Sequence, residues 1–408
     1  MGSARAVAGI AVEKLKIWEG GRAGRLAREV WGADDVPPGF SSARGTILRF
    51  RGLSAGQGRA LLQAAAATGA QAVVHRDCAL GRAETTEALA AGAPQSLRRM
   101  ADGLTAWGEE AAELARAFLG ALAGEFAPGE TVWKCRERIL TTGRRTLIMG
   151  VVNVTPDSFS DGGLFLDPGR AIRHSLQLLE EGADILDFGA ESTRPGAQPV
   201  AAEEEARRLR PIVQALRGQT AAPLSIDTSK SAVAREMLDL GADIINDITA
   251  LRGDPAMAAV CARAKAGVVL MHMQGDPRTM QLNPTYEDVV GEIVDFLGRR
   301  IGAALEAGIA EEGLAVDPGI GFGKTVEHNL RLVAHAGAFG LFGRPVLMGV
   351  SRKSFIGKVL NVEIHDRLEG TAAAVAASAL QGVSIVRVHD VKAMRRVVNL
   401  LDAVLSAR

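Results

Sequence analysis

The second part of the chain repeats one unit, a short apolar segment followed by a polar loop and a helical stretch, and this repeat constrains the fold most strongly. The predicted strands are TLIMGVV (146–152), DILDFG (184–189), PLSID (223–227), DIIND (243–247), GVVLMH (267–272), LAVDPG (314–319), PVLMGV (345–350) and SIVRVH (384–389). Amphipathic stretches such as PGRAIRHSLQLLEEGA lie between them and predict helices. Eight strands alternating with helices over roughly 260 residues are the expected size of an α/β (β/α)₈ TIM barrel. A doubly wound open sheet is the alternative that this pattern leaves open.

The chain has 408 residues, which is too long for one average domain and suits two. Residues 1–130 are rich in Ala and Gly, and we expect them to form a small N-terminal α/β domain whose role the sequence does not reveal. The predicted elements there are strands at 46–50 and 71–75, a helix over 56–68 and one or two helices between 95 and 126. The barrel domain is then 131–408, and VWKCRERIL (132–140) predicts a hairpin that closes the bottom of the barrel.

Composition excludes several classes of function. Lys plus Arg and Asp plus Glu both number 47, so the chain as a whole shows no electrostatic signature for binding nucleic acid or an anionic membrane. Cys78, Cys135 and Cys261 are widely separated and predict buried thiols rather than disulfides or a zinc site. Because no apolar run approaches the ~18 residues of a membrane span, and the first residues lack a signal peptide's apolar core, we expect a soluble cytoplasmic protein.

Polar residues stand where the predicted strands end, which is where a TIM barrel carries its active site. Individually they have structural explanations: Asp227 and Asp247 could cap helices, and Lys353 could be a solvated lysine. Together they converge on one rim and predict a site there. The set comprises Asn153, Glu191, Thr193, Arg194, Asp227, Asn246, Asp247, His272, Asp317, Ser351, Arg352, Lys353, Arg387 and His389.

The residue types of this rim indicate the ligand's chemistry. Asp227, Asn246 and Asp317 supply acceptors and an amide, which suit a flat heterocycle with several ring N–H donors, and Lys353 offers a donor to a ring carbonyl or nitrogen. The last predicted strand adds a cationic pair, Arg387 and His389, near the usual phosphate position of the barrel, which indicates an anion such as pyrophosphate. Asn153 adds an oxygen ligand for Mg²⁺.

Three loops are rich in Gly and Pro. NVTPDSFSDGGLF (153–165) and ESTRPGAQPV (191–200) lack apolar periodicity, and we interpret them as lids over the site rather than ordinary surface loops. DPGIGFGK (317–324) superficially resembles a phosphate-binding loop, but Pro318 occupies the first Walker position. We expect its glycines to let the backbone pass close to a bound ring.

Eight motifs in order resemble those of the dihydropteroate synthase family, from about Trp133 to the C-terminus. They are MGVVNVTPDSFSDGG, ESTRPGA, IDTSK, INDI, LMHMQGDPRTMQ, DPGIGFGK, GVSRKSFIG and RVHDV. The resemblance implies condensation of 6-hydroxymethyl-7,8-dihydropterin pyrophosphate with p-aminobenzoate, assisted by Mg²⁺, at the site that sulfonamides occupy in this family. It also implies a homodimer. The N-terminal extension resembles neither the pyrophosphokinase nor the aldolase to which such enzymes are fused elsewhere.

The resemblance also assigns roles to residues. It implies pterin binding by Asp227, Asn246, Asp317 and Lys353; pyrophosphate binding by Asn153, Arg387 and His389; and p-aminobenzoate binding by Thr193, Arg194, Ser351 and Phe322. Asn153 would also hold the metal, and Asp157 is a candidate to approach a cation on the pterin methylene. Among these, the expected catalytic residues are Lys353, Asp227, Arg387 and Asp157.

Two alternatives remain at this point. A methyltransferase that passes a methyl group from methyltetrahydrofolate to a corrinoid would share the barrel and the pterin-binding acids, but would not need SRKSF or ESTRPG. A pterin-binding protein without turnover would bind the ring and release no pyrophosphate.

Overall fold

The computed structural model describes residues 5–7, 10–15, 22–32, 46–68, 70–92, 94–104, 107–123, 131–155, 167–192, 198–276 and 279–407. The chain divides into two compact units, Met1–Ala127 and Pro128–Arg408, and each has its own buried core. The APGE stretch at 127–130, a linker by its composition, lies outside the described residues. Among the described residues, no helix combines the length and apolar character needed to cross a bilayer.

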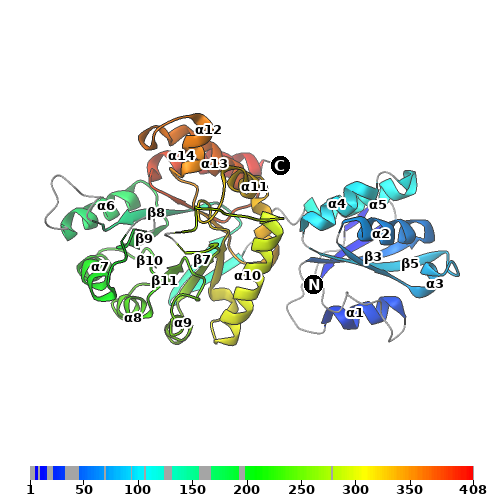
Figure 1. Cartoon of the computed structure of the whole chain (residues 1–408), viewed down its shortest axis with the longest axis horizontal. Coiled ribbons are helices and arrows are strands. Elements are labelled where there is room, and N and C mark those ends of the chain that lie inside the picture. The colour runs from blue at the N-terminus through cyan, green and yellow to red at the C-terminus, as the bar shows by residue number, and fades with distance from the viewer. Residues whose placement is uncertain are drawn as a thin grey trace. The chain divides into compact units, whose positions relative to one another are not determined.

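A five-stranded antiparallel sheet, in the order β1-β2-β3-β5-β4, forms the centre of the first unit (Figure 1). Its strands are β1 (Arg5–Val7), β2 (Ile10–Leu15), β3 (Thr46–Ser54), β4 (Gln71–Val74) and β5 (Thr85–Gly92), and its helices are α1 (Arg22–Trp31), α2 (Ala55–Thr68), α3 (Arg76–Ala79), α4 (Pro94–Leu104) and α5 (Glu109–Ala123). Successive residues of β3 enter different cores, since Leu48 packs with residues of α2, α4 and α5 while Ile47 packs with Ala27 and Val30 of α1. This period of two gives the sheet two apolar faces, each covered by helix.

The sequence predicted only part of this first unit. The strands at 46–50 and 71–75 and the helices at 56–68 and 95–126 are present, but β1, β2, β5 and α1 were not anticipated. Strand β5 reads TTEALAAG, and Ala favours helix over strand when judged alone. Its place between β3 and β4 therefore decides its conformation.

Eight parallel strands form the second unit, in the order β13-β12-β11-β10-β9-β8-β15-β14. They are β8 (Leu147–Asn153), β9 (Ile185–Gly189), β10 (Leu224–Asp227), β11 (Ile244–Asp247), β12 (Gly267–Met271), β13 (Leu314–Asp317), β14 (Leu347–Met348) and β15 (Ile385–Val388). The two ends of this order meet where Val316 bridges Val346 and donates its N–H to the carbonyl of Pro345 at 3.0 Å. The sheet is thus a barrel, and the predicted TIM fold is confirmed over the open sheet.

Strand β14 is shorter than predicted, with two residues in place of PVLMGV. Pro345 has no N–H to donate to a ladder, which limits pairing at this point.

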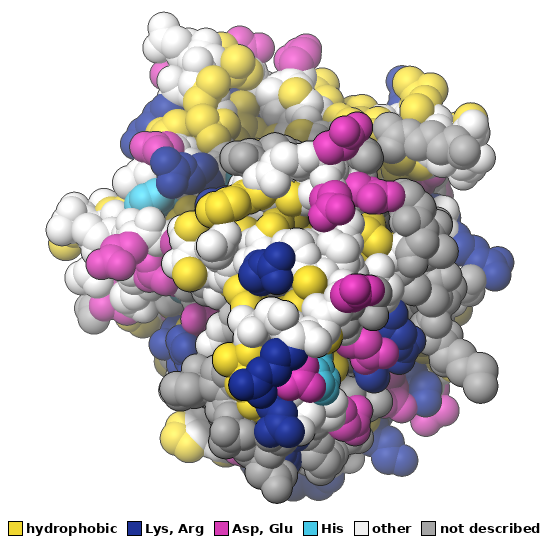
Figure 2. Space-filling view, turned by 90° about the vertical axis from the view of Figure 1, so that its right-hand side faces the viewer, with side chains coloured by type: hydrophobic (Ala, Val, Ile, Leu, Met, Phe, Trp, Pro, Cys, Tyr) yellow, Lys and Arg dark blue, Asp and Glu magenta, His cyan; other side chains and the backbone are white. Residues whose placement is uncertain are grey.

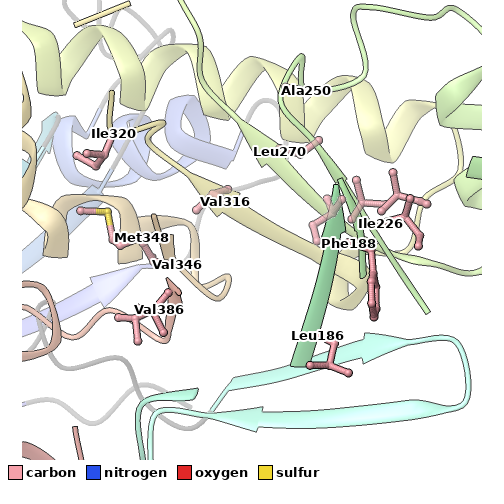
Figure 3. Close-up of a cluster of buried hydrophobic side chains, with 14 of the residues drawn as sticks. Leu186, Phe188, Ile226, Ala250, Leu270, Val316, Ile320, Val346, Met348 and Val386 are labelled. Atoms are coloured by element: carbon pink, nitrogen blue, oxygen red, sulfur yellow. The ribbon is translucent and has the colours of Figure 1, made fainter. Parts of the chain in front are cut away.

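Helices surround the barrel (Figure 1). They are α6 (Pro168–Glu180), α7 (Ala202–Arg217), α8 (Ser231–Asp239), α9 (Met257–Ala264), α10 (Val289–Glu306), α11 (Val326–Ala334), α12 (Ser354–Leu360), α13 (Leu368–Leu380) and α14 (Val391–Ser406), with short 3₁₀ turns at Glu311–Gly313, Ala336–Phe342 and Ile364–Asp366. Outward-facing strand residues such as Leu186, Ile226 and Val316 pack in the layer between sheet and helices (Figure 3). The strands read as continuous apolar runs because this layer covers their outer face while further side chains fill the interior.

A hairpin closes one end of the barrel. Strands β6 (Thr131–Cys135) and β7 (Arg138–Thr142) pair antiparallel, and Trp133 and Cys135 are buried among side chains from the first residues of the barrel strands. The indole N–H of Trp133 donates to the carbonyl of Gly313 at 2.9 Å. The predicted hairpin is therefore confirmed, and it leaves the opposite end, where the strands finish, for a site.

The balance of charge in the sequence is visible at the surface. Figure 2 shows acidic, basic and hydrophobic side chains interspersed on one face of the molecule. Among the side chains coloured there, no extended field of one sign is present, in keeping with the equal totals of 47 acidic and 47 basic residues.

Candidate active site

The polar residues of the rim come together because parallel strands deliver their last residues to the same end of the barrel. Asn153, Asp227 and Asp317 are the final residues of β8, β10 and β13, and Asn246 is the penultimate residue of β11. Ladder pairing places Asp227 opposite Asn246 on one side and Gly189 on the other. The convergence expected from the sequence is thus realised by strand register.

Arg387 of β15 links two carboxylates across the barrel. Its Nε donates to Asp187 Oδ2 at 2.6 Å, and its Nη2 donates to Asp227 Oδ2 at 3.0 Å. Asn246 Nδ2 donates to the same Asp187 oxygen at 3.3 Å. Burial raises the pKa of Asp227, and the guanidinium of Arg387 opposes that rise. Asp227 therefore belongs to a buried ionic network and does not cap a helix.

Three buried polar atoms near this network have no hydrogen-bond partner within the described part of the chain. They are Asp187 Oδ1, Asn246 Oδ1 and Ser225 Oγ, on β9, β11 and β10. Leaving buried acceptors unpaired costs about 1–3 kcal/mol each, so such atoms mark places where a ligand's donors fit. Two of the three are pure acceptors, which suits a heterocycle that presents N–H groups.

Asp187 is the main residue that the sequence reasoning missed. It lies inside β9, in the run ILDFG, and its side chain is fully buried. A carboxylate in the interior of an otherwise apolar strand is costly unless a cation compensates it, and this cost was the available signal.

Asp317 is fixed by the loop that follows it. Its Oδ1 accepts the N–H of Gly319 at 2.7 Å, and burial raises the pKa of this carboxyl to about 6. Gly319 has φ +72°, and a Cβ there would lie 1.9 Å from the carbonyl oxygen of His272. The glycines of this loop thus allow close contact with neighbouring protein atoms, and Gly321 similarly packs against the stem of Lys353.

Lys353 stands over an aromatic ring. Its Nζ lies 4.3 Å from the centroid of Phe322, a cation–π arrangement. Burial, reinforced by the charge of Arg387, lowers the pKa of Lys353 to about 8. Lys353 is therefore half-buried beside the site and is not a solvated surface lysine.

A second lysine, Lys324, was also not anticipated as part of the site. Its Nζ lies 3.0 Å from His272 Nδ1 and donates to the carbonyl of Phe322 at 2.9 Å. Burial lowers the pKa of Lys324 to about 7 and that of His272 to about 2, so the histidine is neutral. His272 thus anchors the loop that carries Phe322.

The other side of the rim carries Asn153, Ser351 and His389. Ser351 Oγ lies 3.0 Å from His389 Nδ1 and accepts the backbone N–H of His389 at 3.2 Å. Burial and the nearby Arg387 lower the pKa of His389 to about 3, so its ring is neutral near pH 7. Asn153 and His389 line a cavity of about 580 Å³. Ser351 is thereby engaged with the histidine expected to bind pyrophosphate.

Several residues of the predicted rim either pair with other protein groups or lie outside the described residues. Asp247 accepts hydrogen bonds from Thr249 and Leu251 and so closes its own turn. It does not cap a helix, because the next helix, α9, begins only at Met257. Arg352 pairs with Asp390 through two hydrogen bonds, and Glu191 accepts from Lys230. Asp157, Thr193 and Arg194 lie outside the described residues, as do most residues of the two loops interpreted as lids.

Comparison with known proteins agrees with this geometry. The model of the pterin binding enzyme family matches residues 149–389. Dihydropteroate synthase of Synechocystis sp. is 44% identical over 262 residues, which is 64% of this chain and 91% of that protein. The Escherichia coli dihydropteroate synthase is 46% identical over 261 residues, covering 64% of this chain and 92% of that protein.

Solved structures give the same result. A Yersinia pestis dihydropteroate synthase in a sulfonamide complex has a TM-score of 0.64 and 42% identity, covering 68% of this chain and 100% of that one. A Xanthomonas albilineans dihydropteroate synthase with 4-aminobenzoic acid has a TM-score of 0.64 and 46% identity, covering 68% of this chain and 99% of that one. Fold, motifs and polar rim therefore agree, and this chain belongs to the dihydropteroate synthase family of pterin-binding enzymes.

Proposed function

We propose that the protein is an active dihydropteroate synthase in folate biosynthesis. It condenses 6-hydroxymethyl-7,8-dihydropterin pyrophosphate with p-aminobenzoate to give 7,8-dihydropteroate and pyrophosphate. The observation that carries the proposal is the buried network of Arg387, Asp187, Asp227 and Asn246, which presents unpartnered acceptors at the end of a barrel of this family.

The pterin ring is assigned to this network. The ring's N–H donors would pair with Asn246 Oδ1 and the carboxylates of Asp227 and Asp317, and Lys353 would donate to a ring carbonyl or nitrogen. Asp187 belongs to the same buried network, where it accepts hydrogen bonds from Arg387 and Asn246 and so orients both side chains. The proposal thus adds Asp187 to the residues expected from the sequence.

The pyrophosphate is assigned to Asn153, Arg387 and His389. The neutral ring of His389 can donate one N–H, and the guanidinium of Arg387 supplies positive charge. Ser351 contacts His389 directly, which supports a role in orienting this histidine rather than one in binding p-aminobenzoate.

Residues of this side also fit Mg²⁺. The side chain of Asn153 is half-buried in the cavity wall and has no hydrogen-bond partner among the described residues. Those residues include no group of three or more His, Cys, Asp or Glu side chains placed for a metal. Mg²⁺ commonly uses one or two protein oxygens plus substrate phosphates, so Asn153 with pyrophosphate oxygens suits it. When bound there, the ion would supply charge to the leaving group.

The p-aminobenzoate is assigned to the face formed by Phe322 and the stem of Lys353, with Thr193 and Arg194 completing it. The Xanthomonas albilineans relative was solved with 4-aminobenzoic acid, which supports this substrate for the family. An apolar ring wall beside an ammonium group matches an aromatic ring that carries a carboxylate.

The proposed reaction is dissociative. The bond between the pterin methylene carbon and the pyrophosphate oxygen breaks first, and both electrons leave with pyrophosphate. Arg387 and His389 stabilise the charge that develops there, while Asp227 and Asp317 favour positive charge on the pterin. The amine of p-aminobenzoate then forms the new C–N bond and loses one proton. Asp157 is the proposed neighbour of the cation, and the two lid loops would exclude competing water.

The decisive test measures pyrophosphate release and dihydropteroate formation, with Mg²⁺, in the presence and absence of p-aminobenzoate. Formation of dihydropteroate only when p-aminobenzoate is present would support the proposal. Tight pterin binding without turnover would favour the silent pterin-binding protein, and transfer of a methyl group from methyltetrahydrofolate would favour the methyltransferase.

Lys353→Ala should lower kcat at least ~100-fold, and normal activity of this variant would contradict the assigned site.

The assembly is proposed to be a homodimer formed through the C-terminal helices. Exposed large apolar side chains of the described residues concentrate on α12, α13, α14 and the turn before α13, which lie together in Figure 1. They are Val359, Leu360, Ile364, Leu368, Leu380, Leu400 and Val404. Exposed apolar side chains gathered on neighbouring helices are typical of an oligomer interface.

A further inference from the structure

The cavity that begins at Asn153 and His389 extends well beyond the residues assigned to catalysis. Its volume is about 580 Å³, and its far walls come from helices α6 and α14. His174, Gln177 and Glu181 line it on one side, and Lys392 and Arg396 line it on the other. A space of this size exceeds what one phosphate group next to His389 requires.

Two cations of this cavity have no hydrogen-bond or ion-pair partner within the part of the chain that the structure describes. Arg352, which also lines it, is held by both carboxylate oxygens of Asp390. Lys392 and Arg396 form no hydrogen bond or ion pair with any other described residue of the chain. They are four residues apart on α14, so their side chains leave the same face of the helix.

The other described titratable residues of the cavity add no net positive charge, so an anion would be attracted only to Lys392 and Arg396. Burial lowers the pKa values of His174 and His389, so neither ring is cationic near pH 7. Glu181 is the one unpaired acidic residue of the described lining, and its carboxylate accepts a hydrogen bond from Gln177 at 2.8 Å. The positive charge available to a ligand therefore comes from Lys392 and Arg396.

We infer that Lys392 and Arg396 form a second subsite for phosphate-type anions, distinct from the one at Asn153, Arg387 and His389. This inference rests on the proposed function: pyrophosphate released at the first subsite moves outward along the cavity and is held by the two cations before it leaves. The chemistry required is that of a hydrated polyanion, which two solvated cations four residues apart can bind without a rigid cage.

The experiment uses the full chain and two double variants. Lys392→Gln/Arg396→Gln removes both cations, and Arg263→Gln/Arg299→Gln removes two exposed cations from α9 and α10, which follow strands on the opposite side of the barrel. Calorimetric titration measures the Kd of pyrophosphate and, separately, of inorganic phosphate, without substrate and at fixed ionic strength. Product inhibition of the reaction by pyrophosphate is measured in parallel, and melting temperatures report folding.

Because the two subsites are distinct, the parent should show two pyrophosphate binding events. In the cavity variant the event at Lys392 and Arg396 should weaken roughly 3- to 20-fold, as expected for two solvated charge contacts, while the other event stays unchanged. The control variant should stay within about twofold, because its helices follow β11 and β12, on the opposite side of the barrel from the strands that lead to the cavity. Equal pyrophosphate affinity in the cavity variant and the parent would overturn the inference. Weaker binding in that variant alone, in a protein that forms no dihydropteroate, would uphold the subsite while removing the proposed reaction.

Discussion

Arg387 holds two carboxylates that come from different strands. Asp187 belongs to β9 and Asp227 to β10, and both accept hydrogen bonds from this one guanidinium. A planar fork suits this geometry, because its separate N–H groups reach two acceptors at once. The same cation is assigned to pyrophosphate, so stability and catalysis depend on one side chain.

Replacing this cation should therefore destabilise the barrel as well as stop turnover. Arg387→Met leaves two buried carboxylates without compensation, and breaking such an arrangement costs about 3–5 kcal/mol. Urea denaturation followed by circular dichroism measures the free energy of unfolding. The loss should shrink as the pH falls, because protonated carboxyls no longer need the cation. Arg387→Lys, which keeps the charge but not the fork, should lose less stability; an unchanged midpoint for Arg387→Met would contradict this network.

The pH profile of catalysis should have two limbs. The carboxylate of Asp317, whose pKa burial raises to about 6, must be ionised to accept from the pterin. The ammonium of Lys353, whose pKa burial lowers to about 8, must be protonated to donate. The kcat/KM for the pterin substrate should rise through about pH 6 and fall through about pH 8. Lys353→Arg should extend the plateau to higher pH, whereas a profile flat from pH 5 to 9 would argue against both assignments.

The sequence revealed the ends of strands better than their interiors. Asn153, Asp227, Asn246, Asp317 and Arg387 were predicted because strand ends in a barrel meet at one rim. Two other polar residues escaped notice because their role depends on partners distant in sequence. Asp187 is compensated 200 residues away by Arg387, and Lys324 contacts His272, which lies 52 residues earlier.

The hairpin that closes the barrel depends on one small residue. Gly267 begins β12, and a Cβ at this position would lie 2.4 Å from the sulfur of Cys135. The hairpin can sit between the strand ends only because that Cβ is missing.

Gly267→Ala should therefore lower the free energy of unfolding by about 1–3 kcal/mol, the usual cost of overpacking a core. Gly302→Ala in α10 is the matched control: a Cβ there meets nothing within 4 Å, and alanine favours helix, so it should be neutral or stabilising. Adding Cys135→Ala should recover much of the loss, and a double-mutant cycle measures the coupling. Strict additivity of the two changes would rule out the contact.

At the level of elements, periodic patterns predicted the barrel well and the N-terminal sheet poorly. Each barrel strand is covered on both faces and is therefore mostly apolar, which makes it visible in sequence. Strand β5 of the first unit packs into the cores through its own residues Ala88, Ala90 and Ala91. These small residues give little indication of whether a segment forms a strand or a helix. Tertiary pairing decided its conformation, and no local pattern could show it.

For the whole molecule, the two cores argue that the barrel folds by itself. Alignments of 262 and 261 residues with this chain cover 91% of the Synechocystis relative and 92% of the Escherichia coli relative, so those proteins consist almost entirely of the matched region. Residues 128–408 should therefore retain kcat and KM for both substrates, within about twofold. Steady-state assays of the shortened protein test this expectation, and a large loss of activity would give the N-terminal unit a role in catalysis or stability.

The dimer proposal has its own test at this scale. Leu400→Glu/Val404→Glu places charges on the apolar patch of α14, where these side chains are 69% and 48% exposed. Light scattering after gel filtration should show a dimer for the parent and a monomer for this variant, because burying unpaired carboxylates opposes association. Leu80→Glu, at an exposed site of the N-terminal unit, is the control and should remain dimeric. A monomeric parent would remove the proposal.

The junction between β13 and β14, where the barrel closes, lies next to two residues assigned to the ligand. Between β13 and β14 the described backbone shows one bridge, at Val316 and Val346, whereas the other neighbouring strands share continuous ladders. Asp317 is the last residue of β13, and Lys353 lies in the segment that follows β14. A pterin held by both residues would add contacts across the junction where neighbouring barrel strands share the fewest backbone pairs, so binding would reinforce the barrel at that point.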